Sequence, residues 1–372
     1  MRIGFDARMF GPKQGGLGRY VEQLILNLEK LNLDDDFVIF LRRENWHDYT
    51  PSSQRFTKVL VDIPWYGLRE QFELPKIIRQ NNIDLMHFPH WNVPFFYNQP
   101  FVVTIHDLLL LHFPTRRAST RGLILYFIKN FFFKLILRHA ASNAKNIITV
   151  SNFSKNDLIK TLRVSESKIT VTYPAPYPPS SSSNLSTNQN FKITRPYALY
   201  VGVAYPHKNL DRMLTAWQLF CEKTGNRYQL VLVGKKNYFY DRLLKKFGEL
   251  FAMGLVVFTD FVNDNTLSNL YRSADVYVSP SLYEGFGIPP LEAMSHGVPV
   301  IASSSTCMPE VLEGAALYFN PVQTDELVGS LISGFEDQKL RAELSVLGKK
   351  IAAKYSWHIT AKITSEVYQN SV

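Results

Sequence analysis

The chain has 372 residues, of which 46% are hydrophobic and 20% charged, so it is long enough for two domains and too apolar for an intrinsically disordered protein. Its formal net charge of +9 favours anionic partners, but no long run of lysine and arginine occurs, which argues against binding of nucleic acid. Two cysteines, Cys221 and Cys307, are too few for a disulfide framework and match no metal-ligand spacing, so a reduced, cytoplasmic setting is expected.

Short apolar segments alternate with longer helical patterns along the chain. In the first half the predicted strands are RIGFDA (2–7), FVIFL (37–41), IDLMHF (83–88), FVVTIHD (101–107) and NIITVS (146–151). In the second half they are YALYVGV (197–203), YQLVLVG (228–234), LVVFTDF (255–261), ADVYVSP (274–280) and VPVIAS (298–303). Continuous apolar runs are typical of parallel strands covered on both faces. The alternation therefore predicts an α/β protein with two doubly wound domains, whose ligands bind at the carboxyl ends of the strands, in a cleft that the two domains share.

A segment that is poor in helix- and strand-forming residues separates the two halves. YPAPYPPSSSSNLSTNQN (173–190) begins with prolines and continues with small polar residues, which is typical of a linker. The predicted division is an N-terminal domain over 1–175, a linker over 176–194, a C-terminal domain over 195–355 and a last helix within 356–372. The alternative is a long surface loop inside one domain.

Two segments of the first half carry candidate functional residues. GPKQGGLGRYVEQLILNL (11–28) does not fit the dinucleotide-binding fingerprint; Gly15, Gly16 and Gly18 are expected to form a flexible loop that leads into a helix beginning near Arg19. FVVTIHDLLLLHFP (101–114) places His106 and Asp107 at the end of a strand, where the histidine could donate to a hydroxyl of a ligand or share a proton with Asp107. A buried structural histidine is the alternative. The spacing of His87, His90 and His112 with Asp107 indicates no metal cluster.

The segment RGLILYFIKNFFFKLILRHAA (121–141) is apolar on nearly all faces but contains Lys129, Lys134 and Arg138. Its apolar part is too short to span a bilayer. It is compatible with a helix that packs on the sheet with its lysine stems extended toward water, and with a helix that lies in the membrane interface.

In the second half, YVGVAYPHKNLDRML (200–214) reads as strand, turn and helix. Lys208 lies near the start of the helix, where a cation opposes the helix dipole unless an anion is also bound, so it is a candidate phosphate ligand. An ordinary exposed lysine is the alternative.

SPSLYEGFGIPPLEAMSHGVPVIAS (279–303) combines two carboxylates with glycines and prolines. Pro289 and Pro290 fit the first positions of a helix, and Gly297 its end, so Glu284 is expected on a loop and Glu292 in the first helical turn. A glycine-bearing loop that runs into a helix N-terminus can bind an anion, and carboxylates accept hydrogen bonds from hydroxyls. A nucleotide-sugar carries both features. Alternatively, Glu292 merely complements the helix dipole and Glu284 is a solvated loop residue.

EGFGIPPLE (284–292) matches the E-x7-E motif of the retaining GT-B glycosyltransferases, and the surrounding PSLYEGFGIPPLEAMSHGVPVIAS and PEVLEGAALYFNP resemble the group 1 family (family 4). The resemblance covers nearly the whole chain. It implies the GT-B fold, with two Rossmann-like domains facing a central cleft, the donor site mainly on the C-terminal domain and the acceptor site mainly on the N-terminal one. It also implies that the last helix packs back on the N-terminal domain.

The resemblance implies roles for individual residues. Glu284 is expected to contact the donor sugar, Glu292 the ribose, Lys208 the diphosphate, and His106 the donor sugar from the other domain. The family often has arginine where this chain has Val203 and His207, so Lys235 or Lys236 could replace one contact. The expected catalytic residues are His106, Glu284 and Lys208; the donor-binding residues are Gly16, Gly202, His207, Lys208, Gly234, Lys235, Val262, Gly285, Phe286, Gly287 and Glu292; the acceptor-side residues are Gly15, Gly18, Arg19 and Asp107.

The function expected from this resemblance is retaining transfer of a hexose, with mannose from GDP-mannose as the first candidate, to a hydroxyl of a cell-surface glycan or a lipid-linked acceptor. No metal or other cofactor and no nucleic acid is expected. Residues 121–141 could contact anionic membrane, which would place the enzyme in the cytoplasm or at the inner face of the membrane. The alternatives are a GT-B nucleotide-sugar epimerase and a non-catalytic binder of membrane or nucleic acid, and the intact EGFGIPPLE argues against the second.

Overall fold

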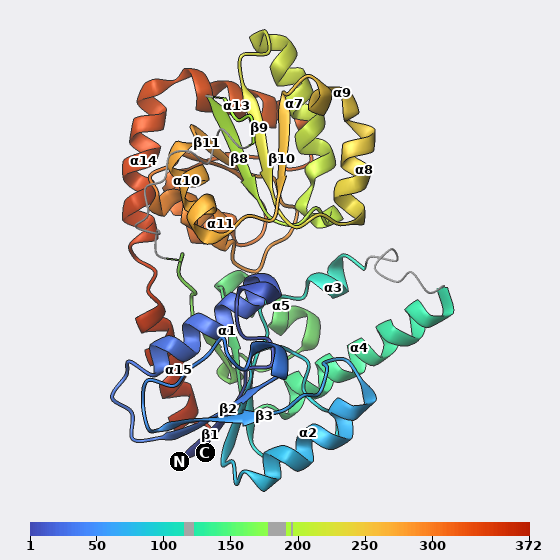
Figure 1. Ribbon diagram of the computed structural model, residues 1–372, viewed down its shortest axis with the longest axis vertical. Coiled ribbons are helices and arrows are strands. Elements are labelled where there is room, and N and C mark those ends of the chain that lie inside the picture. The colour runs from blue at the N-terminus through green and yellow to red at the C-terminus, as the bar shows by residue number, and fades with distance from the viewer. Residues whose placement is uncertain (115–122, 178–190, 195) are drawn as a thin grey trace. The chain divides into compact units, whose positions relative to one another are not determined.

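The structure is a computed structural model that describes residues 1–114, 123–177, 191–194 and 196–372, with residues 123–125 described by their backbone only. The chain divides into two compact units (Figure 1): unit 1 is Met1–Pro174 with Ser356–Val372, and unit 2 is Ala175–Tyr355. Most of the predicted linker over 176–194 lies outside the described residues.

Unit 1 is built on a parallel sheet. Among its described residues the sheet has seven strands in the order β3-β2-β1-β4-β5-β6-β7. The strands are β1 Arg2–Asp6, β2 Asp36–Leu41, β3 Phe56–Leu60, β4 Leu85–Phe88, β5 Phe101–Thr104, β6 Asn146–Thr149 and β7 Ile169–Val171. β1 is fully covered because its apolar side chains are buried on both faces, and it pairs with β2 on one side and β4 on the other.

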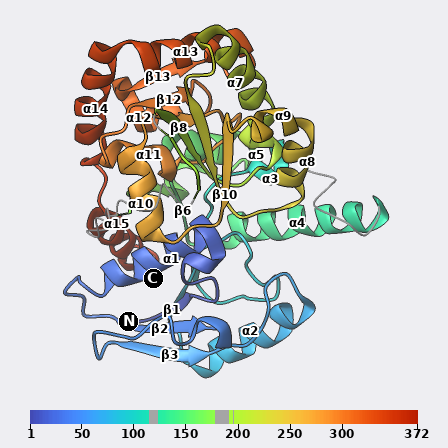
Figure 2. The same ribbon diagram turned by 45° about the horizontal axis from the view of Figure 1, so that its top comes forward.

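Helices cover both faces of this sheet, as Figures 1 and 2 show. They are α1 Gly15–Leu28, α2 Leu68–Gln80, α3 Leu109–His112, α4 Leu123–Asn143, α5 Asn152–Leu162 and α15 Trp357–Gln369. α5 begins where it does because the Ser151 hydroxyl accepts a hydrogen bond from the Ser154 N–H, which caps the helix.

The C-terminal helix α15 packs against α1 within unit 1. The buried Tyr368 hydroxyl lies 2.6 Å from His87 Nδ1, and Gln369 Nε2 donates to Asp35 Oδ2 over 2.7 Å. The last residues of the chain therefore complete the core of the unit that the first residues begin.

The glycine segment after β1 differs from the prediction. Helix α1 begins at Gly15, so Gly15, Gly16 and Gly18 lie in its first turns and do not form a flexible loop before Arg19. Gly18 is buried because the Gly11 backbone crosses the helix there: the Gly11 N–H donates to the Gly18 carbonyl over 3.1 Å, and a Cβ on Gly18 would lie 2.1 Å from the Gly11 oxygen. The glycine thus permits a close backbone approach at the start of the helix.

Unit 2 has a second parallel sheet, which in its described residues contains six strands in the order β10-β9-β8-β11-β12-β13. The strands are β8 Tyr197–Val201, β9 Gln229–Val233, β10 Val256–Asp260, β11 Val276–Ser279, β12 Val300–Ser303 and β13 Ala316–Phe319. The helices are α7 Leu210–Thr224, α8 Tyr238–Lys246, α9 Gly248–Ala252, α10 Asp264–Ser273, α11 Ile288–Ser295, α12 Met308–Leu312, α13 Thr324–Glu336 and α14 Gln338–Ala352.

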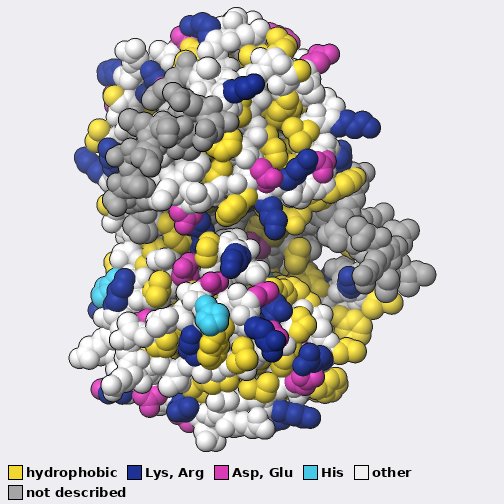
Figure 3. Space-filling model, in the orientation of Figure 1, with side chains coloured by type: hydrophobic (Ala, Val, Ile, Leu, Met, Phe, Trp, Pro, Cys, Tyr) yellow, Lys and Arg dark blue, Asp and Glu magenta, His cyan; other side chains and the backbone are white. Residues whose placement is uncertain are grey.

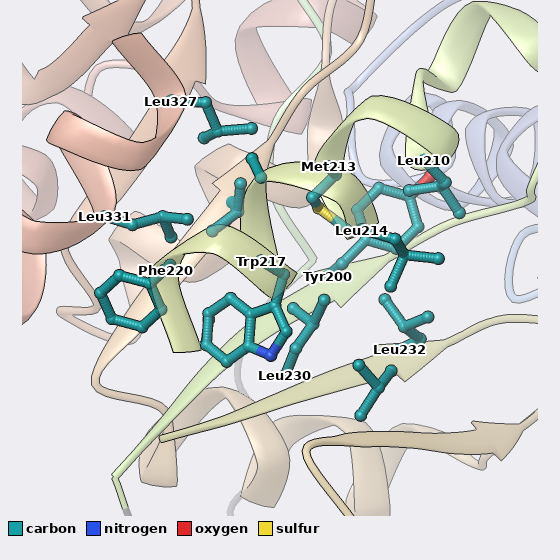
Figure 4. Packing of buried hydrophobic residues seen from close by; sticks show 14 of the residues in the cluster. Tyr200, Leu210, Met213, Leu214, Trp217, Phe220, Leu230, Leu232, Leu327 and Leu331 are labelled. Atoms are coloured by element: carbon teal, nitrogen blue, oxygen red, sulfur yellow. The ribbon is translucent and has the colours of Figure 1, made fainter. Parts of the chain in front are cut away.

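The core of unit 2 forms where α7 packs against α13, which also contacts β12 and β13 of the sheet (Figure 4). Trp217 of α7 is fully buried, and its indole N–H donates to the Leu255 carbonyl over 3.0 Å, which satisfies its one polar atom. Leu230 of β9 and Leu331 of α13 belong to the same cluster. Such packing fixes β8 and β9, whose carboxyl ends carry candidate site residues.

Candidate active site

Two loops of unit 2 meet where the strand order of its sheet reverses. β8 and β11 are neighbouring parallel strands, and the chain continues from β8 to β9 on one side and from β11 to β12 on the other. At such a switch point the loops diverge and ligands bind. The loop after β8 carries Lys208 in the turn Pro206–Lys208, and the loop after β11 carries Glu284. The Leu282 N–H donates to the His207 carbonyl over 2.7 Å, which joins the two loops.

Lys208 and Glu284 form an ion pair at this point. Lys208 Nζ lies 2.5 Å from Glu284 Oε1, and the Ser281 hydroxyl donates to the same oxygen over 2.7 Å. Burial opposes ionisation, but the charge of Lys208 and these two hydrogen bonds hold the pKa of Glu284 below its ordinary value. Glu284 Oε2 is neither buried nor hydrogen-bonded to a residue that the structure describes, so it can accept a hydrogen bond from a ligand.

The backbone after Glu284 turns sharply into α11. Gly287 has φ +92° and caps the helix, and a Cβ at this position would lie 2.8 Å from Met308 Cε. α11 has proline at its second and third positions and ends before Gly297, as predicted, but it begins at Ile288, so Glu292 lies in its second turn and not in the first as predicted. The ring of Phe286 is buried against Tyr355, and the Phe286 carbonyl accepts a hydrogen bond from the Cys307 thiol over 3.1 Å.

Glu292 lies on α11 and is 8% exposed. The Tyr271 hydroxyl of α10 donates to Glu292 Oε2 over 2.9 Å and fixes the position of the carboxylate. A substitution of Tyr271 would therefore change the orientation of Glu292 without touching the loop that carries Glu284.

Gly202 and Gly234 bring the ends of β8 and β9 together. The Gly202 N–H donates to the Val233 carbonyl over 2.8 Å, and the Tyr240 hydroxyl donates to the Gly202 carbonyl over 2.7 Å. A Cβ on Gly234 would lie 1.9 Å from the Gly202 oxygen. Because any side chain at position 234 would clash with this oxygen, the close approach of the turns after β8 and β9 requires glycine there.

In unit 1, His106 follows β5 at the carboxyl edge of the sheet. Its Nε2 donates to the Pro89 carbonyl over 3.0 Å, and its ring meets the Tyr20 ring edge-on at 4.6 Å. Burial lowers the pKa of His106 to about 4, so the imidazole is neutral. Because a carbonyl only accepts, the proton is on Nε2, and Nδ1 can accept but not donate. A hydroxyl would thus donate to His106, the reverse of the expected direction. Asp107 Oδ1 accepts from the Leu109 N–H over 2.9 Å.

Comparison with known proteins decides the family. Residues 14–175 match the family described as Glycosyltransferase Family 4, and residues 182–351 match Glycosyl transferases group 1. The chain is 31% identical over 290 residues to the O-antigen chain mannosyltransferase B of Escherichia coli, a match that covers 77% of this chain and 74% of that protein. The chain belongs to the group 1 glycosyltransferases of family 4.

Two further likenesses extend this result. The glycosyltransferase is 31% identical over 265 residues to the O-antigen chain mannosyltransferase RfbU of Salmonella typhimurium, which covers 71% of this chain and 69% of that protein. Its structure matches Anabaena Alr3699/HepE in complex with UDP-glucose, with a TM-score of 0.73 over 99% of each chain at 18% identity. The predicted GT-B fold of two parallel-sheet α/β units is confirmed.

The structure gathers some of the predicted residues and separates others by unit. His207, Lys208, Glu284, Gly202 and Gly234 lie on neighbouring loops of unit 2, whereas His106, Asp107 and the start of α1 belong to unit 1. His207 is neutral, because burial and the charge of Lys208 lower its pKa to about 4.

The glycosyltransferase has two lysines near Val203, where the family often has arginine. Lys236 Nζ lies 3.3 Å from Asp241 Oδ1, while Lys235 is exposed and pairs with no residue in the described part of the chain. Lys235 is therefore better placed to bind a diphosphate. The side chain of Val262, predicted to bind the donor, is buried and packs inside unit 2.

The histidines that raised the question of a metal have other partners in the glycosyltransferase. His87 bonds Tyr368 and Thr104, and His112 pairs with Asp157. Across the described ranges, no group of three His, Cys, Asp or Glu side chains is arranged to hold a metal ion.

Sequence reasoning missed a buried charge cluster in unit 1, which we name the Arg8 cluster and which consists of Asp6, Arg8, Glu70 and Asn92. Arg8 donates to both oxygens of Asp6 over 2.7 Å and to Glu70 Oε1 over 2.6 Å. Asn92 Nδ2 also donates to Glu70 Oε1, over 2.7 Å. The available signal was the charged FDAR at the end of an apolar strand, which points to a buried ion pair.

Proposed function

We propose that this glycosyltransferase is a retaining hexosyltransferase that moves mannose from GDP-mannose to a hydroxyl of a cell-surface glycan. The proposal for mannose rests on the relatives, which are O-antigen chain mannosyltransferases of Escherichia coli and Salmonella typhimurium. The proposal for a nucleotide-sugar donor is supported by the UDP-glucose complex of a protein with the same fold.

The observation that carries the proposal is the Lys208–Glu284 pair at the switch point of unit 2. An ammonium group has three donors, so Lys208 can hold Glu284 and a diphosphate oxygen at the same time. Glu284 Oε2 is open to a hydroxyl of the donor sugar. The pair thus places a fixed cation beside the leaving group and a hydrogen-bond acceptor beside the sugar, before the reaction begins.

The proposed reaction is front-face substitution at the anomeric carbon. The bond between this carbon and the diphosphate oxygen breaks, the acceptor hydroxyl adds from the same face, and the leaving diphosphate takes the hydroxyl proton. Lys208 and the amides near Gly287 stabilise the charge that develops on the diphosphate. We propose that no metal or organic cofactor takes part.

Thermal unfolding with a panel of nucleotides tests the donor. A ligand at a hundred times its Kd adds about 2.7 kcal/mol to the free energy of unfolding, so GDP and GDP-mannose are expected to raise Tm clearly, and UDP and dTDP little. With EDTA present, transfer from GDP-mannose should continue, and NMR of the product should show the anomeric configuration of the donor. Stabilisation by UDP alone, or an inverted product, would contradict the proposal.

We further propose that α4 docks unit 1 on an anionic membrane surface. Phe127, Phe131 and Phe132 of this helix are 58%, 65% and 52% exposed. Only the C-terminal turns of α4 are buried, through Leu137, Ala140 and Ala141, so the helix does not pack on the sheet over its length. Figure 3 shows apolar side chains gathered over α4 at the right-hand edge of the unit. Within the described residues, no helix is both long enough and apolar enough to traverse a bilayer.

The apolar surface continues beyond α4. Phe95 contacts His139 of α4 at 4.7 Å, and Phe96 stacks at 5.0 Å on Phe72 of α2. α4 carries no acidic residue, and its Lys129, Lys134 and Arg138 are exposed. An exposed aromatic surface with lysine and arginine fits an interface with anionic lipid.

Sedimentation with vesicles tests this contact. The protein should pellet with vesicles containing 30% phosphatidylglycerol, and the double variant Phe131→Ser/Phe132→Ser should bind at least about tenfold more weakly, because two buried aromatic contacts are lost. Ile359→Ser of α15, also a change of an exposed apolar residue, is the control and should bind like the parent. Equal binding of the double variant and the parent would overturn the contact.

A further inference from the structure

Two tyrosine hydroxyls hold consecutive carbonyl groups at the start of the loop after β8. The Tyr240 hydroxyl of α8 donates to the Gly202 carbonyl over 2.7 Å, and the Tyr200 hydroxyl of β8 donates to the Val203 carbonyl over 2.9 Å. Both tyrosines are buried, and Tyr200 belongs to the same core cluster as the apolar side chains of α7 (Figure 4). Two buried side chains from different elements therefore fix the direction of two neighbouring peptide groups.

These hydroxyls stay protonated and act as donors. Burial raises the pKa of Tyr200 and of Tyr240 above the ordinary value of a phenol. A neutral phenol has one proton and a carbonyl only accepts, so each proton points at its carbonyl. Glycines leave room for both hydroxyls, since a Cβ on Gly202 would lie 2.7 Å from the Tyr200 hydroxyl and one on Gly234 would lie 2.9 Å from that of Tyr240.

The direction of these carbonyls sets the direction of the N–H groups that follow them. In a planar trans peptide, the C=O of one residue and the N–H of the next point in opposite directions. The Gly202 carbonyl faces Gly234, directly after β9, so the Val203 N–H points to the other side of β8, where β11 is the neighbouring strand. The Ala204 N–H likewise points away from the Tyr200 hydroxyl. The first of these N–H groups thus faces the side on which the loop after β11 begins.

The N–H groups of Val203 and Ala204 have no hydrogen-bond partner among the residues that the structure describes. Ala204 is 5% exposed, and an N–H in so buried a residue is normally paired, so these groups need a partner that is not part of the chain. Both side chains are apolar, which leaves only the backbone to bind a polar ligand at these positions. Successive backbone N–H groups are typical ligands of an anion, and Lys208 follows in the same loop.

We propose that Tyr200 and Tyr240 are positioning residues of the donor site, which turn the N–H groups of Val203 and Ala204 toward the diphosphate of the nucleotide-sugar. The proposal rests on the proposed function, because the ligand is the donor of that reaction. It assigns two diphosphate contacts to main-chain groups that precede Lys208. The buried tyrosines act through these groups and do not touch the ligand themselves.

Selective labelling isolates the signals of the two N–H groups. The dipeptide Val-Ala occurs once in the sequence, so protein labelled with ¹³C at the valine carbonyl and ¹⁵N in alanine gives one selected amide signal, that of Ala204. Gly-Val occurs twice, so the corresponding label gives two signals, those of Val203 and Val298. The Val298 N–H is paired with the Ala293 carbonyl over 2.9 Å, so its signal is the internal control, and Val298→Ile identifies it.

A titration with nucleotides tests the contact. GDP should move the signals of Val203 and Ala204 downfield in a saturable way, while guanosine, which has no phosphate, should leave both in place and the Val298 signal should not move with either. Signals that stay fixed with both GDP and UDP would overturn the inference, and would overturn it alone if transfer from GDP-mannose still occurs. A shift with UDP but not with GDP would support the amide contacts and overturn only the proposed donor.

Phenylalanine variants test the tyrosines. Tyr200→Phe and Tyr240→Phe remove only the hydroxyl, so each should raise the Kd for GDP about five- to tenfold and leave that for guanosine within about twofold, measured by equilibrium dialysis. Tyr197→Phe is the matched control, because this buried tyrosine at the other end of β8 donates to the Leu270 carbonyl over 2.7 Å. It should lower Tm by a similar amount and change neither Kd. Equal losses for GDP and guanosine, or an unchanged Kd for GDP in both variants, would overturn the positioning role.

Discussion

Replacing Lys208 with methionine is expected to lower kcat for mannose transfer about a hundred- to a thousandfold while the fold is retained. Methionine keeps most of the volume of the side chain but removes the cation that we place beside the departing diphosphate. Loss of one fixed electrostatic contact to developing charge has this size of effect. The measurement is the initial rate at saturating GDP-mannose, with far-ultraviolet circular dichroism and Tm as checks of folding.

Two further variants separate catalysis from stability. Lys208→Met leaves the Glu284 carboxylate with only the Ser281 hydroxyl, so the double variant with Glu284→Gln should recover stability but not activity. The matched control is Lys354→Met, which breaks the exposed Lys354–Glu313 pair of the same unit, 2.7 Å long, and should leave kcat unchanged. If Lys208→Met keeps a third or more of the parental kcat, the electrostatic role of this lysine is wrong.

Most strands that were predicted from sequence are buried on both faces; β10, a partly exposed end strand, was predicted as well because its sequence is nonetheless continuously apolar at its start. β2, for example, is apolar from Phe37 to Leu41 because α-helical layers cover both sides of it. β3 and β7 were missed. They lie at the two ends of the sheet, where FTKVL alternates with an exposed residue and ITV has only three residues, so neither gives a continuous apolar run.

The candidate site could be predicted in parts but not as an arrangement. Each loop was visible because its glycines, prolines and charges follow a strand, yet the contact of Lys208 with Glu284 joins residues 76 positions apart. Only the pairing of β8 with β11 brings these loops together. Glu70 could not be recognised from sequence at all. In LREQFELPKIIRQ it is one of several charged residues, a pattern typical of an exposed helix face. The structure shows that it is fully buried and paired with Arg8.

Arg8→Met is expected to lower the free energy of unfolding by about 3–5 kcal/mol, because it leaves Asp6 and Glu70 buried beside each other without a cation. Arg8 is 2% exposed and also donates to the Ile63 carbonyl over 3.2 Å. Burial alone would lower the pKa of Arg8, but the two carboxylates raise it above its ordinary value, so the guanidinium is the charge that holds the cluster together. Urea unfolding measures the loss.

Arg55→Met is the matched control, since Arg55 pairs with exposed Asp34 and Asp36 at 3.7 Å and donates to the Asp34 carbonyl over 2.7 Å at the surface, and it should change the free energy of unfolding by less than about 1 kcal/mol. A similarly small change for Arg8→Met would mean that water reaches the cluster. The triple variant Asp6→Asn/Arg8→Met/Glu70→Leu removes all three charges together and is expected to regain most of the stability, as apolar replacements of buried ion networks often do. Recovery of stability in the triple variant would show that the fold tolerates an uncharged cluster and that the loss in Arg8→Met comes from the two carboxylates left without a cation.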